Sequence, residues 1–173
     1  MKEKTQIYLT GFMGVGKSAV SHELCRSWGM REVEMDGVIQ EEQQMAISQI
    51  FQEKGEAYFR ELETALLRRL KEAEEPLVVS CGGGAVMRRE NVALMKERGV
   101  VVLLTAEAET IYQRVKDSRE RPLLNGNMNP GYIRKLMEER RPKYEAAADI
   151  QVATDGRTTE DICREILDLW KKR

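Results

Sequence analysis

Residues 11–18 read Gly-Phe-Met-Gly-Val-Gly-Lys-Ser and fit the pattern G-x-x-x-x-G-K-[ST] of a phosphate-binding loop. They follow a short apolar segment, residues 7–10, that is typical of a strand, and they lead into the helical pattern of residues 17–28. Glycines let successive backbone N–H groups point at phosphate oxygens, and the positive end of the helix dipole faces the same anion. Lys17 adds a cation at the outer phosphates, and the Ser18 hydroxyl can ligate magnesium. The alternative is a chance glycine turn with a surface lysine, but the strand–loop–helix context favours a nucleotide site.

Length and composition indicate one globular domain covering residues 1–173. Hydrophobic residues make up 42% and charged residues 33%, which argues against disorder. The formal net charge is −1, from 28 basic and 29 acidic residues, so we expect no nucleic acid and no membrane surface as partner. The N-terminus is polar, and the apolar run after it is too short for a secretory signal or a membrane span. A cytoplasmic protein is the expectation.

Cysteine and histidine give no sign of a metal centre. Cys25, Cys81 and Cys163 form no CxxC pair, and His22 is the single histidine. We therefore expect reduced thiols that pack as small apolar residues.

Apolar runs alternate with helical patterns along the chain, which indicates parallel β-α-β units in an α/β fold. The five predicted strands are residues 7–10, 32–35, 77–81, 100–105 and 150–153. The predicted helices are residues 17–28, 39–54 in parts, 56–73, 89–98 with Gly99 as cap, 108–115, 132–147 and 159–171. Residues 117–131 hold prolines, glycines and asparagines, which favours a mobile loop.

Three distinctive segments each follow a predicted strand. They are the loop at residues 11–18, Asp36, and the glycines at residues 82–84. Ligands bind at the carboxyl ends of strands in parallel sheets, so we expect these segments to meet in one crevice.

With these motifs the chain resembles shikimate kinases from Gly11 to Arg157. The resemblance rests on Gly11-Phe12-Met13-Gly14, Asp36, Phe59-Arg60, Gly82-Gly83-Gly84, Arg121-Pro122-Leu123-Leu124, and Arg140 followed by Pro142 and Tyr144. It implies a three-layer P-loop fold with a central five-stranded parallel sheet flanked by helices. It also implies a mobile lid at about 117–131 and acceptor-binding helices at about 37–73. The implied reaction moves the γ-phosphate of ATP to the 3-hydroxyl of shikimate with Mg²⁺, a step of aromatic amino acid biosynthesis.

The resemblance also implies the roles of individual residues. The catalytic residues would be Lys17, Asp36 and Arg121, and magnesium would be held by Ser18 and, through water, by Glu34. ATP would be bound by Gly11, Met13, Gly14, Val15, Gly16, Lys17, Ser18, Ala19, Arg114, Arg121 and Arg157. Shikimate would be bound by Asp36, Phe51, Phe59, Arg60, Gly82, Gly83, Gly84 and Arg140.

The physical properties of the acceptor residues agree with these roles. Arg60 and Arg140 could each grip a carboxylate through the planar guanidinium fork. Asp36 could hold the acceptor hydroxyls and take the attacking proton, or it could cap a helix over residues 37–41. Glu63 lies three residues after Arg60 and either orients it or forms an ordinary surface pair.

Other features stay open at this point. By their residue type alone, Phe51 and Phe59 would both be core residues. The family usually carries Asp-x-Asp after the second strand, whereas this chain has Glu34 and Asp36, which keeps the charge and adds one methylene. The alternatives are a related kinase for gluconate or a nucleoside monophosphate, and a nucleotide-binding module without catalysis. No amphipathic seam demands a partner, so we expect a monomer.

Overall fold

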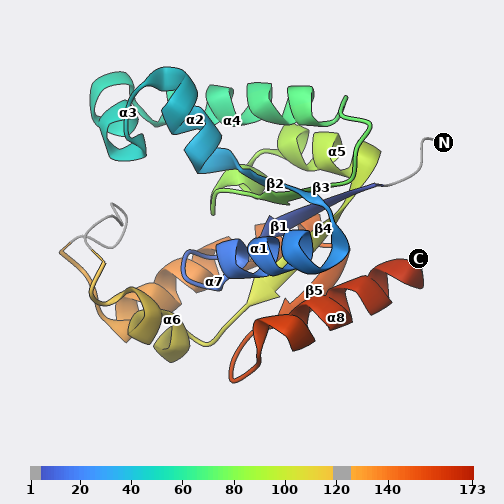
Figure 1. Ribbon diagram of the computed structural model, residues 1–173. Coiled ribbons are helices and arrows are strands. Elements are labelled where there is room, and N and C mark those ends of the chain that lie inside the picture. The colour runs from blue at the N-terminus through green and yellow to red at the C-terminus, as the bar shows by residue number, and fades with distance from the viewer. Residues whose placement is uncertain (1–4, 119–125) are drawn as a thin grey trace.

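The computed structural model describes residues 5–118 and 126–173, and five parallel strands form its centre (Figure 1). The strand order is β2-β3-β1-β4-β5, so the chain builds outward in both directions from β1. The strands are β1 (Gln6–Thr10), β2 (Arg31–Glu34), β3 (Leu77–Ser80), β4 (Gly99–Thr105) and β5 (Ile150–Ala153). The predicted five-stranded parallel sheet is therefore confirmed.

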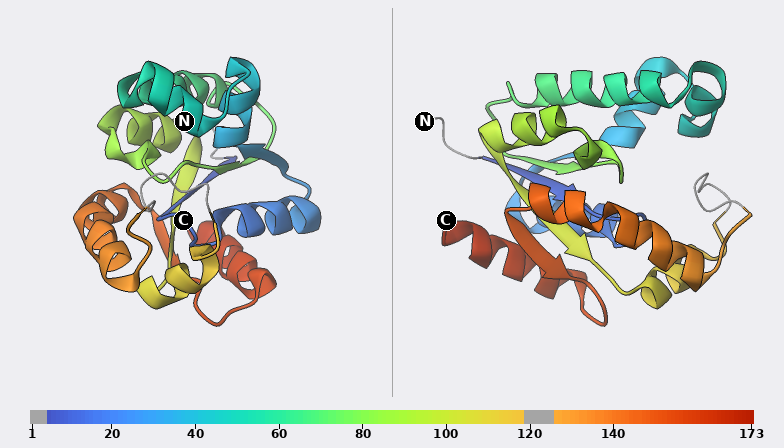
Figure 2. Two further views of the ribbon diagram at one scale, coloured as in Figure 1. Left: turned by 90° about the vertical axis from the view of Figure 1, so that its left-hand side faces the viewer. Right: turned by 180° about the vertical axis from the view of Figure 1, so that it is seen from behind.

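Helices cover both faces of the sheet and give three layers (Figure 2). One face carries α1 (Lys17–Trp28) and α8 (Thr159–Lys171), which pack against each other. The other face carries α5 (Arg89–Arg98) and α7 (Pro130–Ala147), with α4 (Glu56–Leu70) packed on α5. The remaining helices are α2 (Met35–Gln43), α3 (Ile47–Lys54), α6 (Ala108–Val115) and the short 3₁₀ helix η1 (Ala85–Met87).

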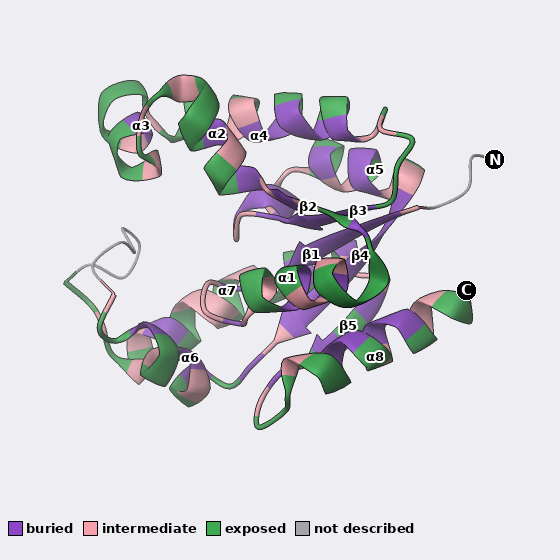
Figure 3. Cartoon of the chain, viewed as in Figure 1, coloured by how far each residue is buried: buried purple, intermediate pink, exposed green. Residues whose placement is uncertain are grey.

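Burial along the strands follows their position in the sheet (Figure 3). Every residue of the central strand β1 is buried, because helices cover both of its faces. The edge strand β5 instead alternates buried and exposed residues. The polar Gln6 is tolerated inside because its amide donates to the Leu70 carbonyl at 2.8 Å and accepts the Tyr8 hydroxyl at 2.5 Å.

Two predicted boundaries were wrong in an informative way. Residues 32–35 were expected as a strand, but Met35 already begins α2, so the helix follows β2 without a loop. The last long helix was expected from residue 132, but it begins at Pro130. Asn129 caps that helix by accepting the Tyr132 N–H at 2.9 Å, and proline suits the first helical position.

Smaller corrections concern element ends. The helix expected over residues 56–73 stops at Leu70, and the strand expected over residues 77–81 stops at Ser80. The pattern at residues 39–54 divides into α2 and α3 around Gln44, whose φ is 51°. Gly99 follows α5 as expected, but in an extended conformation, and it is also the first residue of β4.

The structure bears on the thiols and on membrane insertion. The three cysteines are free, and Cys81 and Cys163 are buried. Burial raises the pKa of Cys81, so this thiol stays protonated and unreactive. Among the described residues, no helix combines the length and the apolar character that crossing a membrane requires.

Candidate active site

The phosphate loop joins the end of β1 to the start of α1. Gly14 and Gly16 have φ values of 82° and 101°, a region in which a side chain would be strained. Gly16 is the N-cap of α1, and the first turn of that helix carries no acidic residue. The positive end of α1 therefore faces the loop without a competing carboxylate, as anion binding requires.

Lys17 is folded back over its own loop. Its ammonium donates to the carbonyl oxygens of Gly11 at 2.8 Å and Phe12 at 3.2 Å. These contacts hold the cation beside the backbone that would surround the phosphates. Val15 has its side chain in the core, so it can meet ATP through its backbone.

One cavity of about 270 Å³ joins the phosphate loop to the ends of β2 and β3. One wall is formed by Met13, Gly14, Gly16, Lys17, Ser18 and Ala19, and the opposite wall by Glu34, Asp36, Ser80, Cys81, Gly82 and Gly83. The predicted crevice is therefore present, and the phosphate loop, Asp36, Gly82 and Gly83 border it.

The glycine turn, residues 82–84, is closely approached by side chains from α2 and α4. A Cβ on Gly82 would lie 2.9 Å from Glu63 Oε1 and 3.1 Å from Asp36 Oδ1. A Cβ on Gly84 would overlap the Arg60 guanidinium, with only 2.6 Å to its Cζ. Glycine is needed here because the charged groups occupy the space that a side chain would take.

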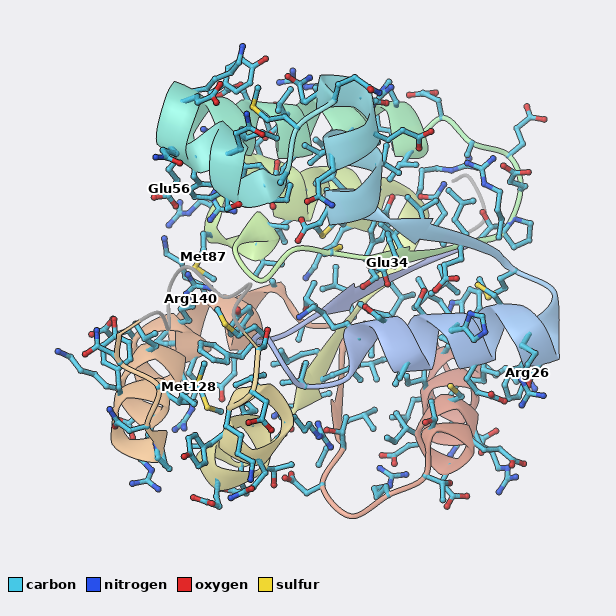
Figure 4. The ribbon with its side chains drawn as sticks, turned by 60° about the vertical axis from the view of Figure 1, so that its left-hand side comes forward. Arg26, Glu34, Glu56, Met87, Met128 and Arg140 are labelled. Carbon is cyan, nitrogen blue, oxygen red and sulfur yellow. The ribbon has the colours of Figure 1, made fainter. Side chains whose placement is uncertain are left out.

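A third helix, α7, approaches the middle of the same turn. A Cβ on Gly83 would lie 3.6 Å from both Arg140 Nη1 and Tyr144 Oη, and 3.7 Å from the carbonyl oxygen of Gly11. Figure 4 shows Arg140 reaching from α7 toward the segment that ends at Met87. The two predicted arginines thus lie on one short turn that faces the phosphate loop.

Arg60 is held in place by two carboxylates. Its Nη1 contacts Glu63 Oε2 at 2.7 Å, and its Nη2 contacts Glu56 Oε1 at 3.1 Å. Glu63 is fully buried, so the ordinary surface pair considered above is wrong. Burial raises the pKa of Glu63, while Arg60 opposes that effect. Burial lowers the pKa of Arg60, but Glu63 and Glu56 outweigh it, so the pKa is raised and the cation is permanent.

Asp36 lies in the first turn of α2, where Glu34 is the N-cap. Asp36 is therefore not the N-cap considered from the sequence, and its carboxylate borders the cavity instead. The first turn of a helix favours a negative charge, so this position suits an aspartate.

Glu34 and Ser18 form the candidate magnesium site. Burial raises the pKa of Glu34, and hydrogen bonds from the Ser18 and Ser80 hydroxyls oppose that effect. Its Oε1 is buried without a hydrogen-bond partner, so this oxygen could bind a water molecule of a hydrated cation. The described residues contain no cluster of three histidine, cysteine or acidic side chains that would hold a metal alone. The residues present fit Mg²⁺ that keeps waters and takes its remaining ligands from phosphates.

Phe59 supports Arg60, and Phe51 packs on Phe59. These two rings, like Arg60 and Arg140, are not among the residues that line the 270 Å³ cavity. Phe59 is buried, and its ring centroid lies 4.9 Å from that of Phe51. The Arg60 Cζ lies 5.4 Å from the Phe59 ring, close enough for a cation–π contact.

The arginines expected near the nucleotide have different surroundings. Arg114 Nη1 donates to the Gly14 carbonyl at 3.0 Å and to Thr154 Oγ1 at 3.3 Å, so it lies on the phosphate loop. Arg157 instead pairs with Glu165 at 2.6 Å and donates to the Ala153 carbonyl at 3.1 Å. The predicted role of Arg121 and the Arg-Pro-Leu-Leu motif fall outside the described residues.

Reasoning from the sequence gave no role to three residues of the site. Ser80 and Cys81 line the cavity, and their position directly before Gly82 could have indicated this. Tyr144 belongs to the motif with Arg140 and Pro142 that carries the family resemblance, but neither its type nor its spacing indicates its contact with Gly83.

The fold and the cavity define a P-loop kinase, with a phosphate loop on one wall and a charged acceptor site on the other. The family model described as Shikimate kinase matches residues 13–171, and the chain belongs to this family of ATP-using enzymes. A shikimate kinase of Persephonella marina is 44% identical over 93% of this chain and 96% of the relative. The solved shikimate kinase of Acinetobacter baumannii in complex with shikimate has a TM-score of 0.90 at 33% identity, over 97% of this chain and 93% of the other.

A gluconokinase of Sinorhizobium meliloti is also similar in structure. Its TM-score is 0.62 at 19% identity, over 98% of this chain and 93% of the other. That similarity shows the fold alone, so it lends no support to gluconate as an acceptor.

Proposed function

We propose that the chain transfers the γ-phosphate of ATP to the 3-hydroxyl of shikimate, releasing ADP and shikimate 3-phosphate. One observation carries the choice of acceptor. Arg60, Arg140 and Asp36 gather on the glycine turn, across one cavity from the phosphate loop. A ring with one carboxylate and several hydroxyls matches two guanidinium groups and one aspartate.

The donor half of the mechanism neutralises charge. The loop N–H groups and Lys17 hold the phosphates, and Arg114 supports the loop from the side of the adenine. Arg157 would lie further out beside the base, and Arg121 would close over the phosphates from the lid. Mg²⁺, held by Ser18 directly and by Glu34 through water, would neutralise charge on the phosphates.

The acceptor half positions the nucleophile. Arg60, fixed by Glu63 and Glu56, and Arg140 would hold the carboxylate, so the ring has one orientation. Asp36 would accept a hydrogen bond from the attacking hydroxyl and take its proton as the bond to phosphorus forms. Asp36 and Lys17 line the same cavity, so a hydroxyl held by Asp36 would face the γ-phosphate at Lys17.

The cellular setting follows from the same proposal. A biosynthetic kinase for small molecules would act in the cytoplasm as a monomer, with no nucleic acid and no membrane as partner. The near balance of 28 basic and 29 acidic residues supports this setting.

An acceptor screen tests the proposed function. ADP release would be measured with ATP, magnesium and one of shikimate, gluconate or AMP, with ³¹P NMR of the product to locate the phosphate. We expect turnover with shikimate alone and phosphate on its 3-hydroxyl. Turnover with AMP or gluconate but not shikimate would contradict the proposal, and ATP binding without turnover on any acceptor would favour the non-catalytic module.

A further inference from the structure

Tyr144 is a buried residue of α7 that the proposed mechanism does not use. It follows Arg140 by one helical turn, so both side chains lie on the same face of the helix. Its hydroxyl donates to the carbonyl oxygen of Gly83 at 2.5 Å. The Arg140 guanidinium lies at the same turn, since its Nη1 and the Tyr144 hydroxyl would both be 3.6 Å from a Cβ on Gly83, and its charge and a hydrogen bond from it lower the pKa of this phenol. One phenol group therefore connects an acceptor arginine to the glycine turn.

We propose that Tyr144 is a positioning residue that locks Arg140 and the glycine turn into one rigid unit for binding the acceptor carboxylate. The inference rests on the proposed function, because it assigns Arg140 to that carboxylate. It adds a hydrogen-bonded support behind the arginine, comparable to the support that Glu63 gives to Arg60.

The direction of both hydrogen bonds follows from the groups involved. A guanidinium has donors and no acceptor, so its bond to Tyr144 must run from an Arg140 N–H to the phenol oxygen. The phenol proton is then free to point at the Gly83 carbonyl, as the 2.5 Å distance shows. Burial raises the pKa of Tyr144, so the hydroxyl keeps the proton that it donates.

The glycine turn needs such a support because glycines leave the backbone free to move. The Gly82 carbonyl is tied by the Ala85 N–H at 3.0 Å, and Tyr144 ties the next carbonyl. Lys143 adds a second link from α7 by donating to the Met87 carbonyl at 3.3 Å, but that lysine is exposed. A preorganised turn and a fixed Arg140 reduce the conformational entropy lost when the acceptor binds.

The competing interpretation makes Tyr144 a packing residue only. Its ring is 5% exposed and lines a second cavity together with Phe12 and Val15. A phenylalanine would fill the same space, so this interpretation predicts no change in acceptor binding after Tyr144→Phe.

Tyr8 provides a matched control within the same chain. Its hydroxyl also donates at 2.5 Å, to Gln6 Oε1, and the residue is fully buried in β1. Tyr8→Phe and Tyr144→Phe thus each remove one buried hydroxyl and one hydrogen bond of 2.5 Å. They differ in that the hydroxyl of Tyr144 lies at the glycine turn and also interacts with Arg140.

The experiment measures steady-state kinetics and amide hydrogen exchange on both variants. For Tyr144→Phe we expect the KM for shikimate to rise about tenfold, as for loss of a hydrogen bond to a charged group, with the KM for ATP within about twofold. We also expect faster exchange of the Gly82, Gly83 and Gly84 amides. Tyr8→Phe should change neither quantity. In an Arg140→Met background, Tyr144→Phe should raise the KM for shikimate far less than in the wild type.

The inference and the proposed function fail in different ways. A wild type that leaves shikimate unphosphorylated would overturn the function, while the exchange rates at the glycine turn would still test the role of Tyr144. Equal KM values and equal exchange rates in wild type and Tyr144→Phe would overturn the positioning role, with the kinase assignment intact.

Discussion

The phosphate loop and the glycine turn face each other across one cavity, yet the chain builds them in opposite ways. The loop draws on eight consecutive residues, 11–18, and its backbone, Lys17 and Ser18 supply the groups that meet the phosphates. The glycine turn has three residues without side chains and borrows its chemistry from α2, α4 and α7. The bond from Tyr144 to Gly83 spans 61 positions of the chain.

This difference distinguishes a site made by one continuous loop from a site made by the packing of several helices. A loop that binds anions through amides needs only its own conformation, and its glycines and helix start supply that. A turn that collects charged side chains depends on the packing of three helices, so each charge has to be supported where it is buried. Substitutions in the phosphate loop should therefore lower turnover. Substitutions around the glycine turn should lower acceptor affinity and folding stability.

The largest effect is expected at the phosphate loop. Lys17→Ala should lower kcat by about 10²–10³-fold, because the cation acts on charge that develops in the transition state. The melting temperature should change little, since Lys17 borders a cavity. Steady-state kinetics and circular dichroism check both statements. Lys96→Ala is the control, because it removes a half-buried cation that pairs with Asp149. Loss of the folded circular dichroism spectrum in Lys17→Ala would contradict the claim that Lys17 affects turnover without affecting folding.

The next largest effect is expected at Asp36, which borders the cavity between the phosphate loop and the glycine turn. Asp36→Asn keeps the shape of the side chain but removes the proton acceptor, so kcat should fall by about 10²-fold. The KM values for shikimate and ATP should change less, because the amide can still hydrogen-bond a hydroxyl. Initial rates at saturating substrates measure this effect. An unchanged kcat would mean that Asp36 only positions the acceptor.

The acceptor arginine should show a combined effect on affinity and stability. Arg60→Met should raise the KM for shikimate by roughly 10–100-fold and leave that for ATP nearly unchanged. It should also cost roughly 3 kcal/mol of folding stability, because Glu63 would be buried without its cation. Urea unfolding measures the second quantity. Equal rises in the KM values for ATP and shikimate would contradict a specific role of Arg60 in acceptor binding.

The stability of Arg60→Met should depend on pH in a defined direction. Burial raises the pKa of Glu63, and removing Arg60 leaves that rise unopposed. An acid with a higher pKa in the folded state binds more protons folded than unfolded, so stability falls as pH rises between the two values. The deficit relative to wild type should grow only above the raised pKa of Glu63 in the folded wild type, because below that value both proteins lose stability alike. The double variant with Glu63→Gln is the control, because it should lose this dependence.

The smallest effect is expected at the magnesium site. Glu34→Gln should raise the magnesium concentration needed for half-maximal rate by about tenfold, since a carboxylate holds metal-bound water better than an amide. Glu34→Asp keeps the charge and should stay within about threefold of wild type. A magnesium titration of the rate compares the two. Equal requirements in all three proteins would remove Glu34 from the metal site.

Much of the fold could be predicted from the sequence, because buried parallel strands appear as short apolar runs. One error fell where an element passes directly into the next, at Met35, since hydrophobic patterns do not mark such a junction, and the other errors concern the ends of elements. The phosphate loop was predictable in full because its binding groups all belong to one continuous segment, residues 11–18.

The acceptor site was predictable only in part. Asp36, Arg60 and Arg140 could be named through the family resemblance, but the burial of Glu63 depends on how α4 packs. The contact of Tyr144 with Gly83 depends in turn on α7 reaching η1 from a distant part of the chain. Such contacts arise from tertiary packing, which periodicity and motif spacing do not encode.

A crystal structure with shikimate and ADP tests the central claim most directly. We expect the shikimate carboxylate between the guanidinium groups of Arg60 and Arg140, and one hydroxyl on Asp36 facing Lys17. A carboxylate bound elsewhere, for example at Arg134 and Arg141 beside the second cavity, would contradict the claim that both anion sites meet at the 270 Å³ cavity.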